Sequence, residues 1–510
     1  MISKVWSATL NGISPFTVEI EVSGNGDGNE NVVSIVGLPD ATVRESKERI
    51  RSAVFASGLT FPKGYATVAL APAEVKKSGA ALDLPIAMAL ISITEKINPA
   101  ALQNTMLIGE LALDGRLRPV KGALALAIHA REQGFARMLV PAENAIEACV
   151  AEGVEIFAVT HFRQAFEILT GQELAFPVTC DIATLFNNTD HFENDFADVK
   201  GQLAVKRGLE IAASGFHNLL MIGPPGCGKS LLAKSYSSIL PRLHLDEALK
   251  VTQIHSIAGT LPSDQSLITS RPFRSPHHTI SDAGLLGGTS NPRPGEVSLA
   301  HNGVLFLDEL PEYRRSTLEV MRQPLESGEV TISRASGTAT FPANFMLLAA
   351  MNPCPCGFYG DVNRECRCSS AQIGRYRGKI SGPLLDRIDI HLEVSSLTDK
   401  EMLSKASGER SENIRVRVEA ARKIQFERFK SGLRSNASMN SSEIGEYCVA
   451  DVAGANLMKS AINDLNLSAR AYDRILRLSR TIADLEGEEK ILVHHIGEAI
   501  QYRTLDRKLW

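Results

Sequence analysis

The segment that most restricts the fold is the glycine-rich stretch Gly223–Ser230, which reads Gly-Pro-Pro-Gly-Cys-Gly-Lys-Ser. A short apolar run typical of a buried strand, Leu219–Ile222, comes before it, and a helical pattern begins at Leu231. This strand–loop–helix context is the one in which a P-loop forms. The glycines let backbone N–H groups turn towards phosphate oxygens, and the helix N-terminus adds its positive dipole end.

The loop and a second, acidic element predict a site for a nucleoside triphosphate with magnesium. Lys229 should reach the β- and γ-phosphates, and the Ser230 hydroxyl should ligate Mg²⁺. The apolar run Val304–Leu307 ends in Asp308 and Glu309, which is a Walker B arrangement. Asp308 is expected to hold the Mg²⁺ shell, and Glu309 to polarise the attacking water. A chance glycine-rich turn and a solvated acidic strand end are the alternatives, and the pairing of the two elements weakens both. The predicted cofactor-binding residues are Gly223, Pro224, Pro225, Gly226, Cys227, Gly228, Lys229, Ser230 and Asp308.

Length and composition are those of a multidomain globular protein. The 510 residues exceed one compact core, so two to four domains are expected. The formal net charge of -4 gives no overall attraction to nucleic acid or membrane, so a nucleic-acid surface would be a local basic patch. No apolar run approaches the roughly 20 residues of a membrane span, and no secretory signal is visible. We therefore expect a cytoplasmic protein with no membrane partner.

The chain changes character along its length. The first 175 residues indicate a mixed α/β domain, in which Thr17–Val22 alternates like a strand with one buried face. A helix is predicted after Pro39, with Thr42 and Glu45 at capping-box spacing. Polar residues around 187–198 favour a linker. From about 199 to 395 strand-like runs alternate with helices, as in a parallel sheet, and the remainder is predicted to be helical.

Longer stretches carry a family resemblance. Besides the P-loop they are Arg271–His278, Pro294–Gly303, Leu305–Pro311 and Ala349–Pro353. On these residues the chain resembles the ComM/YifB family of magnesium-chelatase-like AAA+ ATPases over nearly its whole length. The resemblance implies an α/β protein: a Lon-protease-like α/β domain (1–175), a linker (176–198), a P-loop AAA+ parallel-sheet ATPase core with a helix-2 insertion and a pre-sensor-1 hairpin (199–395), and a C-terminal α-helical lid (396–510).

The resemblance implies three further catalytic residues. Asn352 ends an apolar run where such ATPases carry the sensor-1 residue, which orients the lytic water. Arg387 lies in the segment that carries an arginine finger, which acts on ATP held by a neighbouring subunit and so requires a ring. Arg470 matches the sensor-2 position, which contacts the γ-phosphate from the lid. A strand-end turn for Asn352, and surface salt bridges for the arginines, are the alternatives.

Two basic segments are candidates for gripping DNA. Residues 265–281 contain no acidic side chain but include Arg271, Arg274, His277 and His278. In the family, an insertion at this point faces the pore. Residues 329–340 are predicted to form a hairpin with Arg334 near its turn, resembling the pre-sensor-1 hairpin of ring helicases. Such residues would bind phosphates without reading bases. The alternative is a solvated hairpin.

Four cysteines suggest a metal site. Cys354 and Cys356 are followed by Cys366 and Cys368, and four thiolates could coordinate one Zn²⁺ tetrahedrally. The alternative is four reduced thiols in a loop.

The N-terminal domain is similar to the proteolytic domain of Lon, whose chemistry needs a serine and a lysine. The serine position here is Ala81 and the lysine position is Leu124. The resemblance therefore implies a Lon-like fold reused for DNA binding or assembly, and not an active protease.

Together these features predict a homo-oligomeric ring, hexameric by the resemblance, that uses ATP and Mg²⁺ to translocate single-stranded or branched DNA. The job implied by the family is helicase-type branch migration when imported DNA recombines during natural transformation. The alternatives are a chelatase-type motor remodelling a protein or metal-insertion partner, an ATP-dependent protease, and a non-catalytic scaffold.

Overall fold

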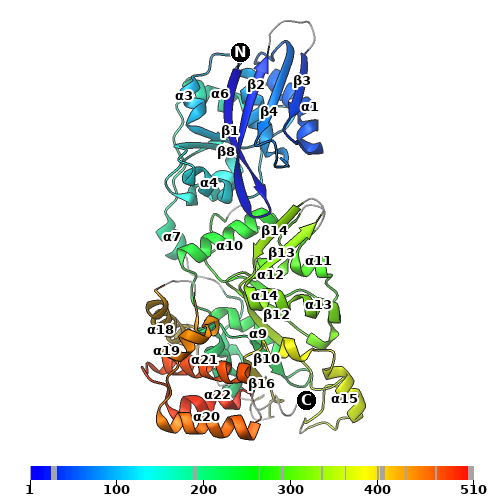
Figure 1. The fold of residues 1–510 in the computed structure, drawn as a ribbon, viewed down its shortest axis with the longest axis vertical. Helices are drawn as coiled ribbons and strands as arrows, with labels where there is room; N and C mark the ends of the chain where they lie inside the picture. Colours follow the sequence, from blue (N-terminus) through cyan, green and yellow to red (C-terminus); the bar gives the residue numbers. More distant parts are fainter. Residues whose placement is uncertain are drawn as a thin grey trace. The chain divides into compact units, whose positions relative to one another are not determined.

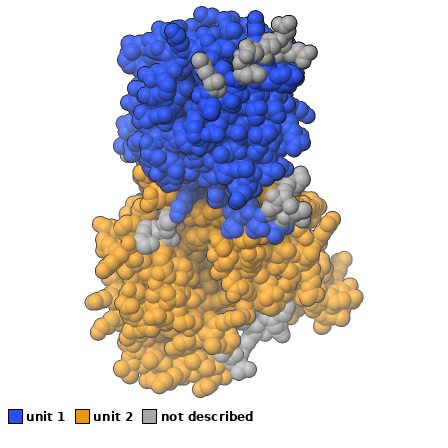
Figure 2. Space-filling model, turned by 45° about the horizontal axis from the view of Figure 1, so that its top comes forward, with its two compact units in different colours: residues 1–188, 249–268, 333–340 blue, residues 189–248, 269–332, 341–510 orange. Residues whose placement is uncertain are grey.

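A computed structural model of the chain describes residues 2–24, 31–187, 192–262, 265–288, 292–334, 337–361, 363–398, 401, 408–430, 434–465 and 468–503. The chain divides into two compact units (Figures 1 and 2). Unit 1 comprises residues 1–188, 249–268 and 333–340, and unit 2 comprises residues 189–248, 269–332 and 341–510. Among the described helices, none is both long and apolar enough to cross a membrane.

Unit 1 is built on a mixed seven-stranded sheet with the order β3-β4-β2-β1-β5-β8-β9 (Figure 1). Its strands are β1 (Ile2–Asn11), β2 (Ser14–Gly24), β3 (Asn31–Val36), β4 (Gly64–Ala71), β5 (Thr105–Leu107), β8 (Arg137–Pro141) and β9 (Glu155–Val159). Strand β1 pairs antiparallel with β2 and parallel with β5. The predicted alternation in β2 is confirmed, because Val18, Ile20 and Val22 are fully buried.

Helices pack on this sheet. They include α1 (Ala41–Ala56), α2 (Asp83–Ile91), α4 (Ala123–Glu132), α5 (Ala142–Ala148) and α6 (Phe162–Thr170). Helix α1 corrects the predicted capping box at Thr42 and Glu45. The N-cap is Asp40, whose Oδ1 accepts the Val43 N–H at 2.8 Å. Asp40 still has extended backbone angles, whereas Thr42 already lies inside the helix.

Ala81 and Leu124, the two residues expected at the positions of a Lon-type dyad, lie in unit 1. Leu124 is fully buried in the first turn of α4, and Glu147 accepts its backbone N–H at 2.9 Å. Burial raises the pKa of Glu147, which also accepts the Ser256 hydroxyl. Ala81 lies in the short 3-10 turn Ala80–Leu82. Neither Ala81 nor Leu124 brings a nucleophile or a base to its position.

Unit 2 is built on a five-stranded sheet with the order β11-β12-β15-β10-β16. Its strands are β10 (Leu219–Ile222), β11 (Phe273–Arg274), β12 (Val304–Leu307), β15 (Met346–Met351) and β16 (Ile390–Glu393). Every pair of neighbours is parallel. All carboxyl ends of the strands therefore meet at one edge of the sheet, and all amino ends meet at the opposite edge.

The C-terminal helices share the hydrophobic core of this sheet. The helices of unit 2 include α8 (Leu203–Gly215), α9 (Lys229–Tyr236), α18 (Ser411–Phe429), α19 (Ser441–Tyr447), α20 (Val452–Leu465), α21 (Ala469–Glu486) and α22 (Val493–Gln501). On α21, Ile475, Leu478 and Ile482 are buried in the same cluster as Leu219 of β10 and Leu348 of β15. Helix α7 (Ile182–Asn187) lies inside the segment expected to be a linker.

The predicted hairpin is confirmed. Strands β13 (Glu329–Arg334) and β14 (Gly337–Pro342) pair as a separate two-stranded sheet. Arg334 is the last residue of β13, and its side chain lies outside the described part of the chain.

Candidate functional site

The P-loop joins β10 to α9 and surrounds the amino group of Lys229. Gly226 and Gly228 have φ angles of 80° and 94°, a left-handed conformation that glycine adopts without strain. Lys229 Nζ donates to the backbone oxygens of Gly223 at 2.7 Å and Pro224 at 2.8 Å. The Lys229 side chain is buried, and burial lowers the pKa of its amino group. A triphosphate would supply the negative charge that keeps this amino group protonated.

Two neighbouring strands bring the other predicted residues to the same edge. Asn352 follows β15, and its Oδ1 accepts from Lys229 Nζ at 3.1 Å. Asp308 follows β12, and its Oδ2 accepts from the Ser230 hydroxyl at 2.8 Å. A hydroxyl and a carboxylate are hard oxygen donors of the kind that Mg²⁺ prefers, so the donor set fits this ion.

Glu309 has an unusual backbone. Its φ of 52° is left-handed, which is uncommon for a residue with a side chain. Its backbone N–H donates to Asp308 Oδ1 at 2.9 Å, and its side chain is 57% exposed. Strained backbone is often found at functional sites. The exposed Glu309 carboxylate takes no part in the contact between Asp308 and Ser230, so the two carboxylates can serve different roles.

His278 lies beside Glu309, with its Nδ1 3.5 Å from Glu309 Oε2. Tyr313 contacts the His278 ring edge-on at 6.3 Å between centroids, and its hydroxyl donates to the Pro276 oxygen at 2.6 Å. The sequence predicted His278 as a DNA contact and missed this position. The order of the strands could have predicted the contact between His278 and Glu309. Strands β11 and β12 are parallel neighbours, so the residues that follow them lie at the same edge of the sheet.

The structure gives Arg271 and Arg274, which were expected in a pore-facing insertion, contacts within the fold. Arg271 is buried, and its guanidinium bonds Glu247 at 2.9 Å and the backbone oxygen of Asn302 at 2.7 Å. Arg274 lies in strand β11 and makes two bonds to Glu296, at 2.7 and 2.8 Å. Both arginines are therefore engaged within the fold. His277 is exposed, and its Nδ1 is 2.9 Å from the Thr279 hydroxyl.

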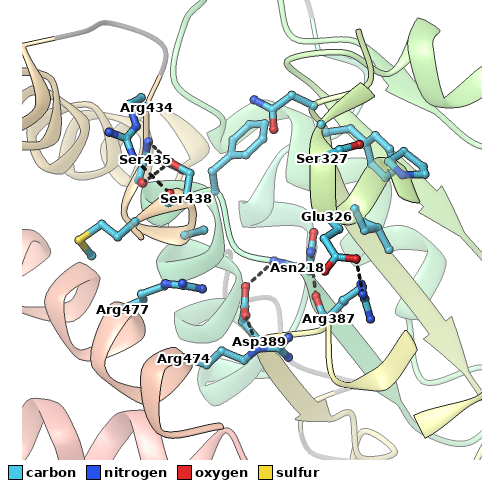
Figure 3. Close-up of a pocket in the computed structure, with 18 of the residues that line it drawn as sticks. Asn218, Glu326, Ser327, Arg387, Asp389, Arg434, Ser435, Ser438, Arg474 and Arg477 are labelled. Atoms are coloured by element: carbon cyan, nitrogen blue, oxygen red, sulfur yellow. Dashed lines mark hydrogen bonds and ion pairs between the residues drawn. The ribbon is translucent and has the colours of Figure 1, made fainter. Parts of the chain in front are cut away.

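Arg387 and Arg470 line a different place, a cavity of about 730 Å³. Figure 3 shows this cavity with Arg387, Arg434, Arg474 and Arg477 labelled. Five arginines face it against three carboxylates, so its lining carries a surplus of positive charge. The arginines are Arg387, Arg434, Arg470, Arg474 and Arg477, and the acids are Glu326, Asp386 and Asp389.

Three of these arginines are held by contacts, including Arg434, which donates to Glu443 at 2.7 Å, and two have free donors. Arg387 Nη2 donates to Glu326 Oε2 at 2.6 Å, and this contact lowers the pKa of Glu326. Arg474 lies towards Asp389, at 3.7 Å (Figure 3). Among the described residues, Arg470 forms no hydrogen bond or ion pair, and the buried Nε of Arg477 has no partner. Donors of this kind are available to an anion.

The arginine-lined cavity lies at the edge of the sheet opposite the P-loop. Phe216 and Asn218 precede β10, Phe345 precedes β15 and Asp389 precedes β16, and all four line the cavity. The P-loop and Asp308 follow the other ends of these parallel strands. No residue of 223–230, nor Asp308, Glu309 or Asn352, is part of the cavity lining. Arg387 and Arg470 therefore do not join the chain's own nucleotide site.

The four cysteines come together in the loop after Asn352. Their sulfur atoms all lie within 4.8 Å of one another, and Cys354 is buried. No cysteine forms a disulfide among the described residues. Two backbone N–H groups, from Phe358 and Arg367, lower the pKa of the Cys356 thiol to about 6.

Comparisons with known proteins match this architecture. Residues 195–402 match the family described as magnesium chelatase, subunit ChlI. Residues 18–144 match subunit ChlI of Mg-chelatase, and residues 408–503 match the ChlI C-terminal family.

Full-length relatives agree with these matches. The uncharacterized protein YifB of Salmonella typhimurium is 42% identical over 499 residues, which cover 97% of this chain and 95% of YifB. The competence protein ComM of Haemophilus influenzae is 40% identical over 497 residues, with the same two coverages. This chain belongs to the ComM/YifB family of magnesium-chelatase-like AAA+ ATPases. Membership in this family implies ATP and Mg²⁺ as cofactors.

A more distant similarity extends to a replication protein. The DNA replication licensing factor Mcm6 of Drosophila melanogaster is 23% identical over 337 residues, which cover 62% of this chain and 37% of Mcm6.

Proposed function

We propose that this protein is an ATP-driven ring translocase on DNA that promotes branch migration during recombination of imported DNA. The observation that carries the proposal is the 40% identity, over nearly the full length, to a protein named for competence. The similarity to a DNA replication licensing factor supports a DNA-directed motor. The β13–β14 hairpin supplies an element on which Arg334 would contact the phosphate backbone.

The nucleotide site accounts for most of the chemistry. Lys229 and the P-loop N–H groups bind the phosphates, while Ser230 and Asp308 hold Mg²⁺. Mg²⁺ held by these two residues would neutralise charge that develops on the phosphate oxygens. Glu309 takes the proton of the attacking water, and Asn352 orients that water.

The site is completed by a neighbouring copy of the chain. Strand β10 has four residues, so at about 3.3 Å per residue the two edges of the sheet are about 13 Å apart. Arg387 lies at the edge formed by the amino ends of the strands, so its side chain cannot reach the phosphates of a nucleotide bound to its own P-loop. In a head-to-tail ring, the arginine-lined cavity of one subunit would meet the P-loop of the next. We assign both Arg387 and Arg470 to the neighbour's γ-phosphate, because both line the same cavity.

Unit 1 would serve in DNA binding or assembly rather than in proteolysis. A Lon-type mechanism needs a serine and a lysine, and this chain places Ala81 and the buried Leu124 at those positions.

A chelatase-type motor acting on a protein or metal-insertion partner is the second candidate, because the matching families are described by magnesium chelatase. One experiment separates the two. ATPase activity of the purified protein should rise when forked or four-way DNA is added, and the protein should sediment as a hexamer with ATP. Equal turnover with and without DNA, together with no DNA binding, would favour the chelatase-type motor.

A further inference from the structure

The sulfur atoms of the four-cysteine loop are spaced for one metal ion. Cys354 Sγ is 3.4 Å from Cys356 Sγ and 3.7 Å from Cys366 Sγ. Cys356 Sγ is 3.6 Å from Cys366 Sγ. A tetrahedron with Zn–S bonds of about 2.3 Å has edges of about 3.8 Å. Soft thiolates in this geometry suit Zn²⁺ rather than Mg²⁺ or Ca²⁺.

The same loop is attached to the nucleotide site at two points. The first is covalent, because Cys354 is separated from Asn352 only by Pro353. The Pro353 oxygen accepts from Arg377 Nε at 3.1 Å, so helix α15 (Ser370–Arg377) secures this short connection. A shift of Cys354 would therefore move the amide that contacts Lys229.

The second attachment is a close packing contact with the P-loop. Gly357 lies between Cys356 and Phe358, and a Cβ added to it would stand 2.6 Å from Pro225 Cδ. The Gly357 backbone thus packs directly on Pro225 of the phosphate-binding loop. Gly357 also donates its N–H to the Cys354 oxygen at 3.0 Å. The cysteine loop and the P-loop cannot rearrange independently.

We propose that Cys354, Cys356, Cys366 and Cys368 bind one Zn²⁺, and that this ion holds Asn352 and the P-loop in the conformation that binds nucleotide. Zinc would thereby control the ATPase site from outside it. The inference goes beyond the proposed function, since it holds whether the motor acts on DNA or on another partner.

The first test is metal content. Freshly reduced protein, purified without a metal-chelating tag, should carry about one zinc per chain by elemental analysis, because four thiolates complete one site. Cys366→Ser and Cys368→Ser should lose most of that zinc, whereas the matched control Cys180→Ser should keep it. Lys229→Ala should also keep it, which separates the metal site from ATP use. Zinc near zero in the parent protein, or equal zinc in all variants, would overturn the proposal.

The second test measures nucleotide binding directly. Zinc is removed from the parent protein with a chelator, and circular dichroism checks that its helices persist. Affinity for a fluorescent ATP analogue should fall about tenfold or more, because the P-loop would no longer be held in the conformation that binds the phosphates. Added Zn²⁺ should restore it. Unchanged affinity in the folded, zinc-free protein would show that the ion does not control the site.

Discussion

His278 Nδ1 lies 3.5 Å from Glu309 Oε2, so an imidazole stands beside the carboxylate assigned to activate water. The two residues leave neighbouring parallel strands, β11 and β12, at the same edge of the sheet. His278 is only four residues after Arg274, the last residue of β11. A change in the conformation of the 275–281 segment would therefore directly change the contact that His278 makes with Glu309.

His278→Ala should lower the turnover number about tenfold or more while leaving ATP affinity nearly unchanged, because it removes a positioning partner of the base and not a phosphate ligand. Steady-state ATPase assays and a binding titration check this. His277→Ala is the matched control, since His277 bonds Thr279 and not Glu309. Equal turnover in the two variants would contradict the role of His278.

Lys229→Ala should abolish nucleotide binding, because its amino group sits at the centre of the phosphate loop. Glu309→Gln should bind ATP normally but hydrolyse it roughly 10²–10⁴-fold more slowly, as expected when a general base is removed. Equilibrium binding and single-turnover hydrolysis distinguish the two variants. Normal hydrolysis by Glu309→Gln would remove the assignment of that residue.

Arg387→Ala and Lys229→Ala should each be inactive alone, yet rings containing both variants should recover turnover. In such a ring the intact P-loop of one chain meets the intact arginine of the next. The expected loss for the single arginine variant is about 10³–10⁵-fold. ATPase assays on rings shown to be mixed check this, and no recovery would count against action between subunits.

Arg470 gives a sharper version of this experiment. Mixing Arg470→Ala with Lys229→Ala should restore activity if Arg470 serves the neighbour, but not if it serves its own chain. Mixing Arg470→Ala with Arg387→Ala should restore nothing, because no cavity then holds both arginines. The opposite pair of results would show that Arg470 acts on the nucleotide bound to its own subunit.

Arg334→Ala should weaken DNA binding similarly for unrelated sequences and reduce the salt slope by about one. Its basal ATPase activity should persist. Arg274→Ala is the contrasting variant, because Arg274 is committed to Glu296 and should leave the salt slope unchanged. Titrations at several salt concentrations check both. A loss confined to one DNA sequence would indicate base readout instead.

Local patterns were enough to predict the elements that carry the nucleotide site. The P-loop, the Walker B strand and the hairpin depend on short segments whose glycines, acidic residues and alternation act locally. The helical character of the C-terminal part was also predicted, and α21 buries Ile475, Leu478 and Ile482 at helical spacing. Long-range partners were not visible in the same way. Arg271 and Arg274 look available in the sequence, but Glu247 and Glu296 lie more than 20 residues away from them.

Position relative to the sheet was also beyond the sequence. Arg470 carries no local signal of which sheet edge it will occupy, because that depends on how α21 packs against strands more than 70 residues away. The prediction of the N-cap of α1 was wrong for a more local reason. Asp40 and Thr42 both suit a cap, and only the backbone angles show which residue is still extended.

The P-loop and the arginine-lined cavity lie at opposite ends of the same strands, and this separation has a consequence for measured rates. If each catalytic centre needs the P-loop of one subunit and the arginine-lined cavity of the next, then the number of catalytic centres equals the number of contacts between subunits and not the number of chains. Specific activity should therefore rise with protein concentration and level off when rings are closed. Dilution below the assembly constant should extinguish hydrolysis even though every molecule remains folded and able to bind ATP.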